Sequence, residues 1–175
     1  MKNILIRLLT LSLLLLLTLS AVSCNNDIEV PEGMQLCSDD SLEYLFFVPT
    51  AWIVNTQSGT TSATRSPDNP VSVTVTLYTP EQSLDIAGYW DLCEEEYKAE
   101  FKDYTLVSET ATEVAGLSAM EYVYTATFSG DSYKFSQTIF IERSKFYVIT
   151  YTAKADSFDS YLSDLTQMKD EMKFR

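Results

Sequence analysis

Along several segments of the chain, apolar and polar side chains alternate with a period of two, which is typical of half-buried β-strands. The segment VSVTVTLYT at residues 71–79 places Val71, Val73 and Val75 on one face and Ser or Thr on the other. Similar strand patterns occupy residues 104–112, 117–128, 133–142 and 146–153. The last three are separated only by the short stretches SGDS and RSK. Strands joined by such short turns predict an antiparallel meander.

The residues before this region predict two or three short strands, in MQLCSDD (34–40) and LEYLFFVPTAWIVNT (42–56), with Pro49 turning the chain. Residues 57–70 are polar and rich in turn-forming Gly, Pro, Asp and Asn, so they predict a long loop. Long polar loops on a rigid sheet often carry binding residues, which makes this loop a candidate for recognition.

Two other segments show the spacing of amphipathic helices. In residues 84–102, one apolar stripe is formed by Ile86, Trp90, Cys93, Tyr97 and Phe101. Residues 157–172 repeat this spacing and predict a closing helix. The meander is apolar on both faces, and such a sheet needs cover on both. The pattern therefore predicts an α+β fold, an α/β/α sandwich whose largely antiparallel central sheet is covered by helices on both faces.

The N-terminal residues predict an export signal rather than part of this domain. Lys2 and Arg7 precede an apolar run from Leu8 to Leu19, which is short for a membrane span but has the length of a signal's apolar region. The run ends in AVSC at 21–24, which resembles the lipobox of bacterial lipoproteins, although those signals most often have Leu where this chain has Ala21. A plain signal peptide and an N-terminal membrane-spanning anchor are the alternatives.

If the lipobox is used, residues 1–23 are removed as a lipoprotein signal peptide and Cys24 carries fatty acyl chains such as palmitate. Each buried CH₂ contributes about 0.8 kcal/mol, so several chains hold a protein firmly on a bilayer. The membrane partner is then the cell membrane, with the protein lipid-anchored on its extracytoplasmic face. Residues 24–34 are expected to be a polar tether. Residues 35–175 are expected to form one domain, which is long enough for a sizeable core.

The charge of the chain excludes one class of partner. It has 12 basic and 25 acidic residues, a formal net charge of −13, and its basic residues are scattered. Nucleic-acid binding requires a clustered basic surface. We therefore expect no nucleic-acid partner.

The two cysteines after Cys24 leave two possibilities open. In an oxidising compartment Cys37 and Cys93 form a possible disulfide, which would contribute roughly 4 kcal/mol in the chain-entropy model. Alternatively, both are free thiols that pack as small apolar side chains. A metal site built on them lacks further ligands, because the chain contains no His. We expect neither a metal nor another cofactor.

The absence of His also excludes Ser-His-Asp, Cys-His and zinc-hydrolase chemistry. Carboxylates are the remaining candidates for catalysis, but structural roles are expected for them. Asp39 and Asp40 are expected in a turn and Asp156 at a helix cap. Asp159 and Asp164 are expected on a solvated helix face. Trp52 and Trp90 are expected in the core rather than on a sugar-stacking surface. We therefore expect no catalytic residues and no enzymatic activity.

The order of several short motifs resembles the PsbP-like family, which has the Mog1/PsbP fold, and especially its bacterial lipoprotein members. The motifs are FFVPTAW (46–52), GYW (88–90), GLSAMEYVYT (116–125), FYVITYTA (146–153) and the terminal MKF (172–174). The resemblance covers roughly residues 35–175. In photosynthetic organisms, members of this family resemble accessory subunits that bind a membrane complex, whereas its lipoproteins in other bacteria have no well-defined activity; the resemblance therefore implies an accessory or binding role. The metal sites of some members use His and are not carried over.

Together these features predict a lipid-anchored extracytoplasmic accessory or binding module that contacts a protein partner at the cell envelope. The alternative is an extracytoplasmic lipoprotein that binds a small molecule or a glycan.

Overall fold

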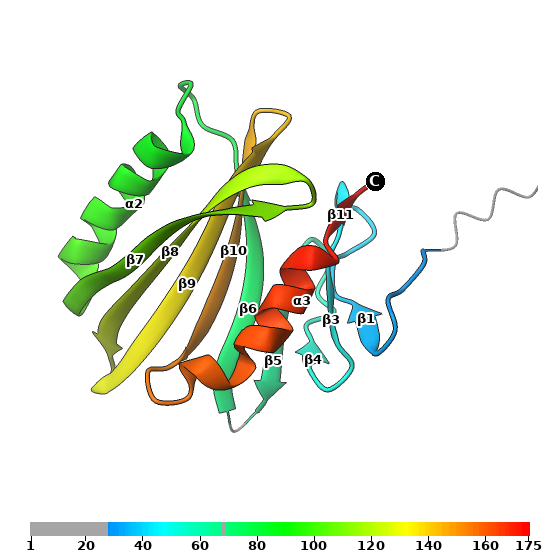
Figure 1. Ribbon diagram of the computed structural model, residues 1–175, viewed down its shortest axis with the longest axis horizontal. Helices are drawn as coiled ribbons and strands as arrows, with labels where there is room; N and C mark the ends of the chain where they lie inside the picture. Colours follow the sequence, from blue (N-terminus) through cyan, green and yellow to red (C-terminus); the bar gives the residue numbers. More distant parts are fainter. Residues whose placement is uncertain (1–27, 68) are drawn as a thin grey trace, which may run out of the picture.

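The computed structural model describes residues 28–67 and 69–175. Within them, a seven-stranded antiparallel sheet of order β4-β5-β6-β10-β9-β8-β7 forms the centre of the domain (Figure 1). Two small sheets, β1-β3 and β11-β2, accompany it. In chain order the elements are β1 (Met34–Leu36), β2 (Tyr44–Leu45), β3 (Phe47–Pro49), β4 (Ile53–Val54), β5 (Ser62–Ser66), β6 (Asn69–Tyr78), α2 (Ile86–Glu100), β7 (Lys102–Val114), β8 (Leu117–Phe128), β9 (Asp131–Glu142), β10 (Lys145–Lys154), the 3-10 turn η1 (Phe158–Tyr161), α3 (Leu162–Asp170) and β11 (Lys173–Phe174).

Strands β7 to β10 form the predicted meander. Each of its three hairpins turns through two residues with positive φ, namely Ala115-Gly116, Ser129-Gly130 and Arg143-Ser144. Two-residue turns of this kind match the right-handed twist of the strands that they join. The predicted antiparallel sheet with two helices is therefore confirmed.

Two predicted regions differ in detail from the structure. The predicted loop at residues 57–70 contains β5, which pairs with β6 and buries Ala63 in the core. Pairing with a neighbouring strand outweighs the turn-forming composition of this stretch. The predicted helix at residues 157–172 begins as the 3-10 turn η1, and α3 occupies only Leu162–Asp170.

Strand β10 separates two hydrophobic clusters. Phe146 and Val148 pack in a smaller cluster with Trp90 of α2. Tyr147 and Ile149 pack in a larger cluster, to which α3 contributes its buried residues. Because successive residues of a strand point to opposite faces, the two helices pack on opposite faces of the sheet.

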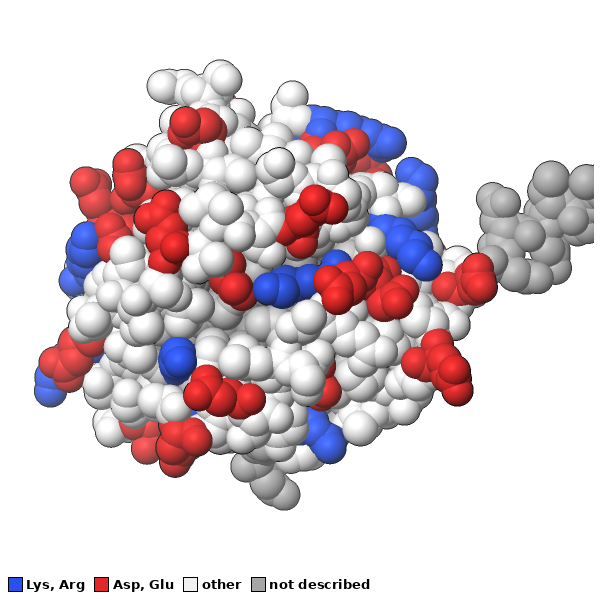
Figure 2. Space-filling model, viewed as in Figure 1, with Lys and Arg blue, Asp and Glu red and all other residues white. Residues whose placement is uncertain are grey.

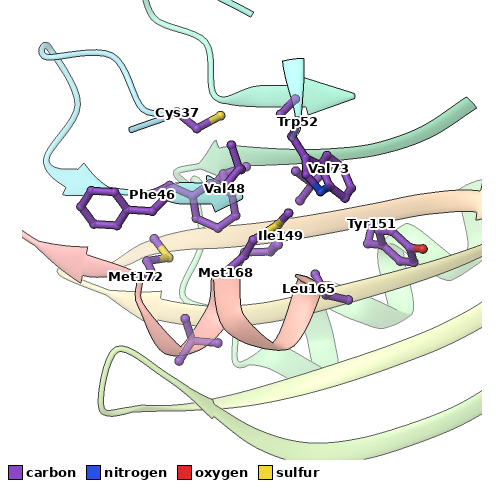
Figure 3. Close-up of a cluster of buried hydrophobic side chains, with 14 of the residues drawn as sticks. Cys37, Phe46, Val48, Trp52, Val73, Ile149, Tyr151, Leu165, Met168 and Met172 are labelled. Atoms are coloured by element: carbon purple, nitrogen blue, oxygen red, sulfur yellow. The ribbon is translucent and has the colours of Figure 1, made fainter. Parts of the chain in front are cut away.

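The larger cluster joins the sheet, α3 and residues 34–54, which we call the N-terminal segment. Figure 3 shows Met168 of α3 close to Val73 and Ile149 of the sheet, with Val48 and Trp52 of the N-terminal segment beside them. Burying such side chains contributes roughly 1.5–3 kcal/mol each. This face is thus covered by α3 together with residues that are more than a hundred positions earlier in the chain.

The helices do not cover the two faces completely. Helix α2 lies toward the β7 side of the sheet (Figure 1), and its aromatic side chains reach β6 only at Tyr78. The even-numbered residues of β5 and most of those of β6, such as Thr64 and Thr76, remain exposed or half-buried. The sandwich is therefore open on one face, over β5 and β6.

An ion pair holds α3 onto the strands of the meander. Lys169 Nζ lies 3.0 Å from Glu121 Oε1, and the Lys169 side chain is only 11% exposed. Ser136 donates a hydrogen bond of 2.6 Å to the same carboxylate oxygen. Burial acts to raise the pKa of Glu121, but the Ser136 hydrogen bond and the Lys169 charge outweigh it, so this pKa lies below its ordinary value.

We expect Lys169→Met to lower the free energy of unfolding by about 1–3 kcal/mol, because it leaves a partly buried carboxylate without its cation. Lys98→Met is the matched control, since Lys98 pairs with Glu94 on the surface and is 55% exposed. The control substitution should lower the free energy of unfolding by less than about 0.5 kcal/mol. Urea denaturation followed by circular dichroism measures both. Equal effects of the two substitutions would show that the buried pair has no special role.

Candidate functional site

The predicted attachment residue, Cys24, lies outside the described residues. Cys37 and Cys93 are free thiols, so the possible disulfide between them is not formed. Cys37 belongs to the larger cluster, whereas Cys93 lies on α2, which packs on the other face of the sheet. The sheet therefore separates the two sulfur atoms.

A hollow of about 230 Å³ lies beside Cys37, between the end of β1 and the loop of residues 55–61 that joins β4 to β5. We call it the acidic hollow, because Asp39 and Asp40 are among its lining residues. It brings together the predicted turn and part of the predicted recognition loop. Its other lining residues are Leu36, Cys37, Ser38, Val54, Asn55, Thr56, Gln57 and Thr60.

The groups in the acidic hollow are unsuited to nucleophilic catalysis. Burial raises the pKa of the Cys37 thiol to about 12, so the thiol stays protonated at neutral pH. Hydrogen bonds from the Ser41 hydroxyl and backbone N–H lower the pKa of Asp39, which keeps this carboxylate ionised. The hollow thus offers negative charge and amide groups, which can bind a cation or a basic side chain.

The structure joins three of the candidate regions around Trp52. Its indole Nε1 donates a hydrogen bond of 2.7 Å to Asp164 of α3. Arg65 of β5 donates to the Ala51 carbonyl and lies 5.7 Å from the ring centre of Tyr161. The Trp52 and Tyr161 rings meet edge to face at 6.3 Å. Asp164 therefore anchors Trp52 rather than lying on a solvated face as predicted.

The remaining candidates stay apart. Asp159 is 81% exposed and lies 3.5 Å from Lys134. Among the residues that the structure describes, no group of three His, Cys, Asp or Glu side chains could hold a metal ion. Trp90 is buried and stacks on Tyr122 at 4.0 Å, as predicted for a core residue.

One group of residues was not singled out from the sequence. A hollow of about 350 Å³ at the C-terminal end of α2 is lined by Phe101, Phe128, Tyr133, Phe135 and Thr152. Phe128 is 59% exposed. These residues come from the C-cap of α2 and from β8, β9 and β10, so only the strand register could have indicated that they meet.

No protein-family model and no curated protein sequence matches this chain. Solved structures do resemble it. Cyanobacterial PsbP (CyanoP) from a Synechocystis species aligns with a TM-score of 0.60 and 14% identity, covering 87% of this chain and 98% of its own. LpqN of Mycobacterium tuberculosis, described as involved in cell envelope biogenesis, has a TM-score of 0.54 and 16% identity, covering 84% of this chain and 81% of its own.

The Ran-binding protein Mog1p of Saccharomyces cerevisiae aligns with a TM-score of 0.52 and 10% identity, covering 78% of this chain and 84% of its own. The chain therefore has the Mog1/PsbP-like fold, which confirms the predicted resemblance. At these identities the likeness shows the fold alone. Within the described residues, no helix has the length and apolarity required to cross a membrane.

We expect Cys37 to react with iodoacetamide at pH 8 at least about tenfold more slowly in the native protein than after unfolding in urea, because its thiol is buried and protonated. Cys93 is only half-buried and should react faster than Cys37 in the native protein. Peptide mass spectrometry after timed alkylation measures both. Rapid native labelling of Cys37, or a peptide containing a Cys37–Cys93 disulfide, would contradict this description.

Proposed function

We propose that this chain is a lipid-anchored, extracytoplasmic accessory module without enzymatic activity that binds a protein partner at the cell envelope of a bacterium. The observation that supports the proposal most is its fold. The same fold occurs in LpqN, which is described as involved in cell envelope biogenesis, and in Mog1p, which is described as binding Ran.

The N-terminal sequence supports the location. An apolar run that ends in AVSC provides a signal and a cysteine for acyl chains. The polar stretch from Asn25 to Gly33 then separates the folded domain from the membrane. Attachment at Cys24 would leave the surface of the folded domain available to a partner.

The chemistry of the described residues favours binding over catalysis. The chain has no His, and the Cys37 thiol is protonated at neutral pH. Ser136 hydrogen-bonds Glu121 but is only 1% exposed, so a substrate cannot reach its hydroxyl. Figure 2 shows acidic and basic side chains interspersed over one face, without a basic patch.

The acidic hollow is the surface that we assign to the protein partner. Asp39 is half-buried and ionised, and Asn55, Thr56 and Gln57 beside it are exposed loop residues. A basic side chain of the partner would be attracted by Asp39 and by the negative charge of the chain, whereas Asp40 already pairs with Arg175 at 3.3 Å.

We expect Cys24→Ser to move the protein from the membrane fraction to the soluble extracytoplasmic fraction, because the acyl chains can no longer be attached. Cys93→Ser is the control and should stay with the membranes. Fractionation of cells followed by immunoblotting measures the distribution. A Cys24→Ser protein that remains as firmly membrane-bound as the unchanged protein would refute the lipid attachment.

A photo-crosslinking amino acid at Thr56 tests the partner. We expect one discrete protein adduct in the cells that naturally make this chain, and a weaker adduct when Asp39→Asn and Asp40→Asn are added. The same crosslinker at Glu95, an exposed position on α2, is the control and should give no such adduct. If Thr56 yields no adduct at the natural expression level, the assignment of this surface fails.

A further inference from the structure

The open part of the sheet presents two rows of hydroxyl groups. Strand pairing places Thr152, Ser72 and Thr64 side by side on β10, β6 and β5. The next row along the strands consists of Thr150, Thr74 and Ser62. All six side chains lie on the face of the sheet on which α2 packs, in the part that α2 does not cover. Each of them is exposed or half-buried. We call these six residues the hydroxyl face.

The first row continues into the hollow at the end of α2. Thr152 pairs with Phe135 of β9, which pairs in turn with Tyr124 of β8. From Phe135 to Thr64 the row crosses three strand spacings, or roughly 14 Å. One line across the sheet therefore runs from an aromatic wall to three hydroxyl groups.

The aromatic wall is rigid. The Phe135 ring stacks on Tyr124 at 4.8 Å and on Phe101 at 6.0 Å. Tyr124 in turn stacks on Tyr97 of α2 at 5.3 Å. Because these rings hold one another, the hollow has its shape before any ligand binds, and little conformational entropy is lost on binding.

A second hollow lies at the edge of the sheet, where β6 extends beyond its pairing with β5. It measures about 500 Å³, and Ser62 and Thr74 of the second row line it. Its wall also includes Tyr44 and Val75 of the larger cluster, so this hollow extends around the sheet edge toward the α3 face. The two rows and the hollow at the end of α2 therefore form one continuous surface on this face.

This surface contains no charged side chain among its described residues, although the chain has 37 Asp, Glu, Lys and Arg residues that could occupy it. At its rim, Lys154 is 3.0 Å from Asp131, so the charges there are paired. An anionic ligand would find no cation on the hydroxyl face and would be repelled by the net charge of −13.

We propose that the hydroxyl face and the hollow at the end of α2 bind a neutral oligosaccharide. The apolar C–H side of one sugar ring packs against Phe135 and Phe128, as aromatic faces favour. Hydroxyl groups of the following sugars exchange hydrogen bonds with the Ser and Thr side chains, each of which can donate and accept.

The strands themselves argue against a peptide here. Along the two rows, the backbone groups of β5, β6 and β10 are paired with one another in the ladder. An extended peptide therefore cannot add as a further strand at the rows themselves. A ligand must use the side-chain hydroxyls, which suits a molecule that is itself rich in hydroxyl groups. This inference does not depend on the protein partner assigned to the acidic hollow.

Calorimetric titration of the purified full-length chain, in a detergent without a sugar head group, tests the proposal. The probes are cellopentaose, laminaripentaose, maltopentaose and chitopentaose, with oligogalacturonate as the anionic comparison. At least one neutral probe should bind with a Kd below about 1 mM. Oligogalacturonate should not bind measurably.

Phe128→Ala combined with Thr152→Val should weaken that binding at least about tenfold, because it removes a stacking ring and a hydroxyl. The matched control is Val107→Ala with Thr125→Val. Val107 is an exposed apolar residue of β7, and the register places Thr125 on the opposite face of the sheet. The control variant should bind the same probe as tightly as the unsubstituted chain does. Thermal melting confirms that both variants are folded.

Three results would overturn the proposal. The first is binding of none of the neutral probes. The second is binding that survives the Phe128 and Thr152 substitutions. The third is a dimer, detected by light scattering, that Phe128→Ala dissociates, since a second copy would then cover this surface.

Discussion

The structure depends on the burial of both faces of its central strands. Along β9 and β10, large apolar side chains point alternately to the two faces, as Ile139 and Phe140 do. Neither face of these strands can be left in water, because each exposed apolar side chain would forfeit roughly 1.5–3 kcal/mol. The positions of α2, α3 and the N-terminal segment follow from this requirement.

The apolar side chains on the two faces of the sheet are buried in different ways. On one face, α2 supplies an aromatic stripe whose members stack on tyrosines of β8, such as Trp90 on Tyr122. On the other, α3 is too short to cover the strands alone, and the segment around Trp52 completes the cover. Polar contacts then fix α3 in place, through Asp164 to Trp52 and through Lys169 to Glu121. Where β5 and β6 change to Ser and Thr, no cover is needed and the sheet remains open.

This arrangement leaves two separate binding surfaces. The acidic hollow lies beside the loop between β4 and β5, and the hydroxyl face lies on the open side of β5, β6 and β10. Both are formed by side chains on a rigid sheet or on short connections. The fold is shared with proteins of different described roles, so these surfaces, rather than the fold, distinguish this chain.

The sequence by itself determined the antiparallel meander, its tight turns, the two helices and the core position of Trp90, because these features depend on the local alternation of apolar and polar residues. Only the tertiary structure decided that β5 is a strand, that Asp164 binds Trp52, and that Cys37 and Cys93 lie on opposite sides of the sheet. The hydroxyl rows also needed the strand register, which sets which Thr and Ser residues stand side by side. Such contacts join residues far apart in the chain, and the local pattern of side chains does not specify which distant residues will pair.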